Sequence, residues 1–105
     1  MTTATVFPDL VAELPVPEDG TLSRTLYQDD QVRLVGFAFA AGQELTEHSS
    51  ALAVVIQVVS GRLHLVLGDQ ESELTAGGWV HLPARLTHTV RALEPTVMLL
   101  TMFRR

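Results

Sequence analysis

Four histidines are the residues of this chain best suited to chemistry, and the sequence contains no cysteine. The lack of cysteine excludes a disulfide framework and a thiolate metal site. A neutral imidazole is the commonest metal ligand in proteins, so His48 and His88 are the first candidates. His64 follows a turn and alternates with Arg62, which predicts an exposed or rim position. The pattern leaves the orientation of His81 open.

Alternation along an extended strand places Ser50 on the same face as His48. If the strand begins early enough, Glu44 and Thr46 share that face, and Glu44 then offers a carboxylate oxygen. Two histidines and one oxygen ligand form a familiar site for non-haem iron and similar metals. Glu44 is therefore one candidate for a third ligand.

Three further polar residues bear on this site. Gln57 interrupts an apolar run and is another candidate oxygen ligand, although alternation from Val54 points it outward. His88 and Val90 are expected to share the inner face of their own strand. Arg85, in the loop before His88, either holds a ligand carboxylate by a bidentate contact or is a solvated loop residue.

The elements that must position these side chains are strands. A short helix is expected over Pro8–Glu13, because Pro8 suits a first helical position and Pro15 follows soon after. After Pro17 the helical period is absent. Apolar and alternating segments between glycine turns predict strands at 33–40, 52–59, 62–67, 70–74, 79–82, 87–92 and 96–103. Short strands at near-regular spacing are typical of an all-β sandwich or barrel.

Two segments combine glycine, histidine and proline residues at fixed spacings: Gly42, His48, Ser50 and Gly61 in the first, and Gly77, Pro83, Arg85 and His88 in the second. Their spacing resembles that of the paired motifs of the cupin superfamily. Over roughly 32–103 the chain therefore resembles a small single-domain cupin. The resemblance implies a double-stranded β-helix, the jelly-roll barrel of that superfamily. We expect a barrel over 32–105 and an N-terminal arm over 1–31 that packs on the barrel or on a partner subunit.

In metal-binding cupins, two histidines and a glutamate of the first motif and one histidine of the second hold a divalent metal. Here His48 and His88 occupy histidine positions, whereas Ser50 replaces the second histidine and Val54 stands at the glutamate position. The resemblance thus implies two of the four ligands for an iron, manganese, nickel, copper or zinc ion, with an oxygen donor completing the shell. The alternative is that the two histidines bond each other, a backbone carbonyl or a buried water. No organic cofactor is expected.

The resemblance also implies an interior pocket at the ends of these strands. Ser50, Val54, Val90 and Arg85 are the residues expected to line it beside the histidines. Arg85 stands at the late glycine position of the second motif and Ala92 at its asparagine position. An apolar cavity with a few convergent polar groups is the usual form of a small-molecule site.

Charge and composition limit the partners. The net charge of −5 lies within the first 31 residues and argues against nucleic acid, which requires a clustered basic surface. The apolar runs are too short to span a bilayer, and the N-terminus lacks the pattern of a signal peptide, so we expect a cytoplasmic protein. Hydrophobic residues make up 47% of this small chain, which predicts that part of its apolar surface is buried in a homodimer.

Three functions fit the sequence. The first is a cupin that binds a small molecule, with or without a divalent metal, and has no assigned reaction. The second is a metal-dependent enzyme, such as a dioxygenase, isomerase or decarboxylase, that acts on a small organic acid or aromatic. The third is a non-catalytic sensor or structural module. One superfold carries many activities, so resemblance of fold does not choose among them.

Overall fold

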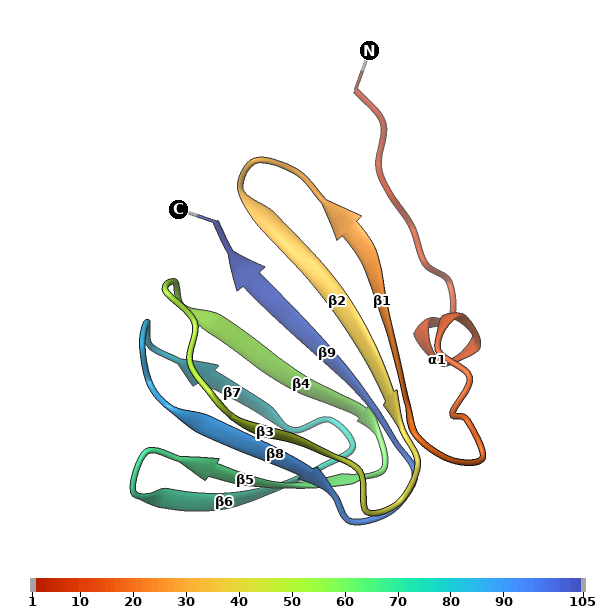
Figure 1. Ribbon diagram of the computed structural model, residues 1–105. Coiled ribbons are helices and arrows are strands. Elements are labelled where there is room, and N and C mark those ends of the chain that lie inside the picture. Colours follow the sequence, from red (N-terminus) through yellow and green to blue (C-terminus); the bar gives the residue numbers. More distant parts are fainter. Residues whose placement is uncertain (1, 105) are drawn as a thin grey trace.

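The computed structural model describes residues 2–104, apart from the side chains of residues 47 and 48. This part of the chain forms a short helix and nine strands (Figure 1). Their bounds are α1 Leu10–Glu13, β1 Thr21–Gln28, β2 Val32–Phe39, β3 Glu44–His48, β4 Val54–Ser60, β5 Arg62–Leu67, β6 Gln70–Thr75, β7 Trp79–Leu82, β8 His88–Ala92 and β9 Thr96–Phe103. The all-β prediction is confirmed.

The strands build two antiparallel sheets that face each other. One sheet has five strands in the order β1-β2-β9-β4-β7, and the other has four in the order β3-β8-β5-β6. Consecutive strands of the chain cross repeatedly between the sheets, which is the jelly-roll arrangement. The two sheets meet along one side of the molecule, visible at the lower right of Figure 1.

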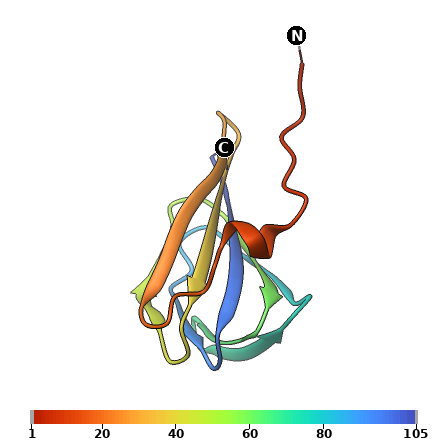
Figure 2. The same ribbon diagram turned by 90° about the vertical axis from the view of Figure 1, so that its right-hand side faces the viewer.

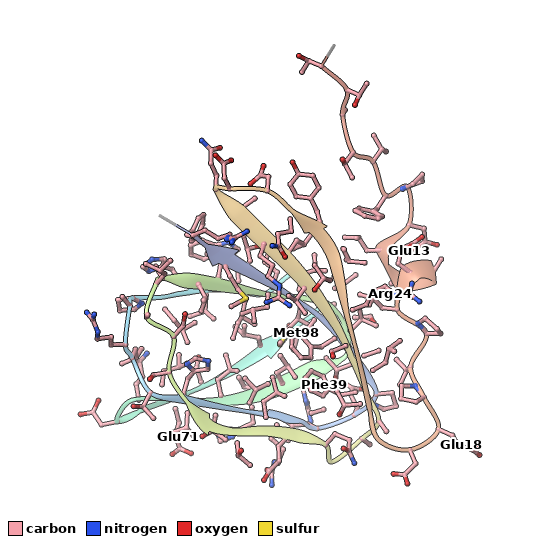
Figure 3. All side chains as sticks on the ribbon, turned by 45° about the horizontal axis from the view of Figure 1, so that its top comes forward. Glu13, Glu18, Arg24, Phe39, Glu71 and Met98 are labelled. Atoms are coloured by element: carbon pink, nitrogen blue, oxygen red, sulfur yellow. The ribbon has the colours of Figure 1, made fainter. Side chains whose placement is uncertain are left out.

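The main core fills the space between the sheets. Alternate residues of each strand point inward, as the pleat requires, and Leu63 and Leu65 on β5 are fully buried. They pack in one cluster with Phe39 and Met98 from the opposite sheet, whose side chains lie between the sheets in Figure 3. Phe37 stacks on Phe39 with ring centroids 5.8 Å apart.

A second, smaller cluster lies on the outer face of the five-stranded sheet. The N-terminal segment crosses this face, and α1 lies against it (Figure 2). Leu14, just after the helix, has no exposed surface and packs with Ala38, Val97 and Leu99. Gly36 leaves room for it, since a Cβ at this position would lie 2.5 Å from Leu14 Cδ1. The arm is thereby fixed to the sheet by one buried leucine.

The structure differs from the sequence-based expectation at three elements. Strand β3 ends at His48, so Ser50, which was expected to share an extended strand with His48, lies in the loop after it. The helix begins at Leu10, because the Asp9 side chain accepts hydrogen bonds from the amides of Val11 and Ala12 and caps it. Pro8 therefore precedes the helix. Strand β1 was not predicted, and it forms the edge of the five-stranded sheet by pairing with β2. The predicted strands agree with the observed ones within two residues at each end.

No helix among the described residues is long and apolar enough to cross a membrane.

Candidate functional site at one end of the barrel

The loop between β7 and β8 positions the second-motif histidine. Arg85 lies at the centre of this loop and has a φ of 68°. Among the described residues it is the only one other than glycine with a positive φ. Its amide donates to the carbonyl of Ser50 at 2.7 Å, which joins this loop to the β3–β4 loop. The backbone thus keeps the conformation that glycine adopts easily, although the motif's glycine is replaced by arginine. The side chain of Arg85 is exposed.

His88 is buried at the start of β8. Only 3% of its surface is exposed, and its Nδ1 lies 3.1 Å from the carbonyl oxygen of Leu86. In a neutral ring this contact favours the tautomer with the proton on Nδ1, so that Nε2 is the acceptor nitrogen. Val90, two residues later, is 1% exposed and packs in the main core, as expected of the inner face. The predicted inward orientation of this pair is therefore confirmed.

The first-motif histidine is only partly described. The backbone of His48 pairs with that of His88 across β3 and β8, while its side chain lies outside the described residues. A register shift separates this pair from Leu45, which lies opposite Val90. Three residue steps on β3 therefore match two on β8, and simple alternation cannot be carried from Glu44 to His48.

Glu44 lies on the outer face of the four-stranded sheet. It is exposed and opposite Arg91, whose own neighbour on the other side is His64. Nε2 of His64 lies 3.2 Å from a carboxylate oxygen of Glu71, which Figure 3 shows at the outside of the barrel. His64 is half-buried on this charged face, in agreement with its predicted place beside Arg62. The structure does not bring Glu44 to His88.

Gln57 lies on the outer face of the five-stranded sheet. Its strand neighbours are Trp79 and Leu99, and its parity matches that of Val55 rather than that of the inward-facing residues of β4. The outward orientation expected from alternation is confirmed. His81, whose orientation the sequence left open, is exposed on this face opposite Val55.

The described donors do not fit the family's metal. At the motif positions, Ser50 uses its hydroxyl oxygen to accept the amide of Leu52 at 3.3 Å, and Val54 is a buried aliphatic residue with no donor. Within the part of the chain whose side chains are described, no three histidine or acidic side chains group around one point. Metal sites in proteins usually use three or four ligands, so His88 with these neighbours is an incomplete set.

A pocket of about 230 Å³ opens at the same end of the barrel, between the β1–β2 hairpin, the β3–β4 loop and the end of β9. Its lining includes Gln28, Arg33, Ser50, Leu52, Met102 and Arg104. Of the residues expected to line an interior pocket, Ser50 lies at this opening, whereas Val54 and Val90 pack in the main core. Sequence reasoning missed Arg33, although its phase with the inward-facing Phe37 and Phe39 was readable from alternation.

One row of residues runs from this pocket across the inner face of the five-stranded sheet. Gln28 pairs with Arg33, Arg33 with Met102, Met102 with Val54, and Val54 with Leu82. Gln28 and Arg33 are exposed, and Met102 is half-buried. Val54 and Leu82 are buried, with 3% and 1% of their surface exposed. The row therefore changes from polar and hydrated to apolar and dry along its length.

A second pocket, of about 470 Å³, lies on the outside of the same sheet. The N-terminal arm forms one wall with Thr3 and Phe7, and the sheet forms the other with Tyr27, Leu34 and Thr101. Among the described residues, no backbone hydrogen bond joins residues 2–8 to the barrel. This space separates the arm from the sheet and has no connection to the motif residues.

Comparisons with known proteins agree with this architecture. A conserved protein of unknown function from Streptococcus pyogenes superposes with a TM-score of 0.87 at 28% identity, over 100% of this chain and 91% of that one. A cupin superfamily protein from Desulfitobacterium hafniense gives 0.87 at 22% identity, over 100% and 95%. Salicylate 1,2-dioxygenase from Pseudoaminobacter salicylatoxidans gives 0.74 at 18% identity, over 79% of this chain and 26% of that one.

No curated protein matches the chain. The family model described as the cupin domain matches residues 37–103, which is more than half of the sequence. That match includes both motif segments and eight of the nine strands in whole or in part. The chain belongs to the cupin family.

Proposed function

We propose that this cupin binds a small organic molecule in the 230 Å³ pocket at the open end of the barrel. The observation that carries the proposal is the composition of that pocket. Its lining combines apolar side chains, with Met102 and Leu52, and a few polar side chains, among them Gln28 and Ser50. This is the usual build of a small-molecule site.

The size of the pocket limits the ligand. A volume of 230 Å³ corresponds to the liquid volume of about eight water molecules. A ligand of about ten non-hydrogen atoms fits that space, and ligands of this size bind with dissociation constants on the order of 0.1 mM. The protein is therefore expected to recognise a metabolite-sized compound rather than a polymer.

Thermal unfolding in the presence of small metabolites tests the proposal. A compound that binds only the folded state raises the melting temperature, and at 100 times its dissociation constant it adds about 2.7 kcal/mol. Replacement of Met102 by Glu places a charge in the pocket lining and is expected to abolish the shift. An equal shift in this variant contradicts the proposed site. Exposed Glu94, remote from the pocket in the β8–β9 turn, serves as the control through Glu94→Gln.

A metal-dependent enzyme is the second function considered, and the described donors support it less. Its support is the Nδ1 contact of His88 to a backbone carbonyl, an arrangement that in metal sites fixes a histidine for coordination through Nε2. Elemental analysis of the wild type and of His88→Ala tests it. Near-stoichiometric metal that is lost in the variant moves this function ahead, and equal metal content in both proteins counts against it.

We also propose that the chain forms a homodimer through its N-terminal arm. The arm extends past the barrel in both views (Figures 1 and 2) and leaves Val6 71% exposed. Residues 2–8 form no backbone hydrogen bond with the described part of the barrel, and an extended segment of this kind is suited to pairing with a second subunit. Light scattering is expected to give twice the 11.5 kDa mass of the chain, and a variant lacking residues 2–8 is expected to be monomeric. A monomeric wild type contradicts this arrangement.

A further inference from the structure

From the charge of the open-end pocket we infer that its ligand is a small apolar carboxylate, held by Arg33. The inference rests on the proposed ligand site and names the chemical class that the site accepts. The carboxylate would lie at the hydrated end of the inner-face row, beside Arg33 and Gln28. The hydrocarbon part would lie over the apolar side chains of the lining, Met102 and Leu52.

The charged side chains described at this pocket are positive. Among the described residues, its lining contains two arginines, Arg33 and Arg104, and no acidic side chain. The chain as a whole carries a net charge of −5, so this pocket reverses the overall sign. Neither arginine forms an ion pair with a carboxylate of the described residues. An anionic ligand would be the counter-ion of Arg33.

The two arginines of the lining differ in the contacts that their guanidinium groups already make. The Nη1 of Arg104 donates to the backbone carbonyl of Asp29 at 2.8 Å, and the Asp29 carboxylate lies near enough to act on this guanidinium electrostatically. Within the described part of the chain, Arg33 makes one side-chain hydrogen bond, from Nη2 to the hydroxyl of Thr25 at 3.1 Å. That bond fixes the guanidinium and leaves most of its five donors for a ligand. Arg33 is therefore the anchor, and Arg104 adds positive charge beside it.

The guanidinium group of Arg33 is suited to bind a carboxylate. A guanidinium presents two parallel N–H groups whose spacing matches the two oxygens of a carboxylate, and the bidentate pair is stronger than bonds to neutral groups. Gln28 lies directly across the β1–β2 pair and adds an amide donor to the same end of the row. Met102, the next residue of the row, is apolar and half-buried at the pocket, which disfavours a ligand that is polar throughout.

The β1–β2 hairpin holds this arrangement in register. Asp29 accepts the backbone amides of Gln31 and Val32 at 2.8 and 2.9 Å and closes the turn between Gln28 and Arg33. The amide of Asp29 donates to the carbonyl of Val32 at 3.0 Å. Because the turn fixes the pairing of β1 with β2, the two donors face the pocket together.

The experiment uses matched acids and amides as probes of the full chain. Benzoate and hexanoate are titrated against the ¹⁵N-labelled protein, beside the neutral isosteres benzamide and hexanamide, and acetate serves as the acid without an apolar part. We expect saturable shifts at the amides of Arg33, Ser50 and Met102, with dissociation constants on the order of 0.1–1 mM for benzoate or hexanoate. The amides and acetate are expected to bind at least tenfold more weakly.

Variants decide whether Arg33 is the anchor. Arg33→Gln is expected to weaken the acids at least tenfold and to remove their advantage over the amides. Arg33→Lys keeps the charge without the bidentate geometry, so we expect its affinity for the acids to lie between those of the wild type and Arg33→Gln. Arg85→Gln, at the same rim but outside the pocket lining, and Arg91→Gln, on the outer face of the other sheet, are expected to bind as the wild type does.

Two outcomes overturn the inference, and they differ from the failure of the proposed site. Amides that bind at the pocket as tightly as the acids leave a ligand site but refute the carboxylate class. Acid binding that survives Arg33→Gln and is lost in Arg85→Gln would show that Arg85, and not Arg33, holds the carboxylate. If neither acids nor amides shift the pocket residues, the proposed ligand site itself fails, and the inference fails with it.

Discussion

Leu14 and Gly36 provide the sharpest test of how the N-terminal arm is held to the barrel. Leu14 has no exposed surface, and an added Cβ at Gly36 would lie 2.5 Å from Cδ1 and 2.6 Å from Cδ2 of that leucine. Truncating a fully buried leucine to alanine costs about 2–5 kcal/mol, from lost transfer energy and the remaining cavity. We therefore expect Leu14→Ala to lower the free energy of unfolding by about 3 kcal/mol, or about 10–20 °C in melting temperature.

Gly36→Ala is expected to destabilise for the opposite reason. The new methyl group overpacks the site, which costs about 1–3 kcal/mol, while the loss of glycine's freedom in the unfolded chain returns about 0.4–1 kcal/mol. The net loss is about 1–2 kcal/mol. In the Leu14→Ala background the clashing atoms are gone, so the added methyl group enters the cavity and is neutral or stabilising.

A double-mutant cycle measured by urea unfolding checks this reasoning. The double variant is expected to be more stable than the sum of the single changes predicts, by about 1–2 kcal/mol. Val11→Ala on the exposed side of α1 is the control, and its expected effect is within about 0.5 kcal/mol. Changes at Leu14 and Gly36 that add within about 0.5 kcal/mol would show that the leucine does not occupy the space above the glycine.

Three further changes test other parts of the structure. Arg85→Gly relieves a left-handed backbone costing about 1–2 kcal/mol, offset in part by glycine's greater freedom when unfolded, so a gain of about 0.5–1 kcal/mol is expected in urea unfolding; a loss would contradict it. Thr96→Val removes a buried hydroxyl that accepts the amide of Arg62 at 3.0 Å, and the expected cost is about 1–3 kcal/mol, with a cost under about 0.5 kcal/mol refuting the role of that bond. A hydrogen bond from the backbone amide of Gln31, together with smaller contributions from other donors, lowers the pKa of Asp29 below its ordinary value. This carboxylate therefore stabilises the fold at pH values above its pKa in the unfolded chain, and that contribution is lost as the pH falls through its pKa in the folded state. Stability measured from about pH 7 to pH 2 should therefore fall less steeply at the acid end in Asp29→Asn than in the wild type, and identical slopes would count against this linkage.

The sequence by itself determined seven of the nine strands of the described residues and the faces of most of them. Glycine turns and alternating leucines set β5 at residues 62–67, as observed, because a half-buried strand needs a period of two. The parity of Gln57 and of His88 was likewise readable, since no irregularity interrupts either strand at those points. The two motifs carried the family, and the family carried the topology that no local pattern specifies.

Only the tertiary structure decided which residues meet. The register shift in β3 breaks the alternation from which Glu44 was expected beside His48, and such a bulge has no signature in this sequence. Strand β1 depends on pairing with β2 rather than on its own polar pattern. Arg33 became a candidate anchor only when the pairing of β2 with β9 placed it beside Met102 at the open-end pocket. Contacts of this kind join segments far apart in the chain, so their geometry is fixed by packing and register and not by local sequence.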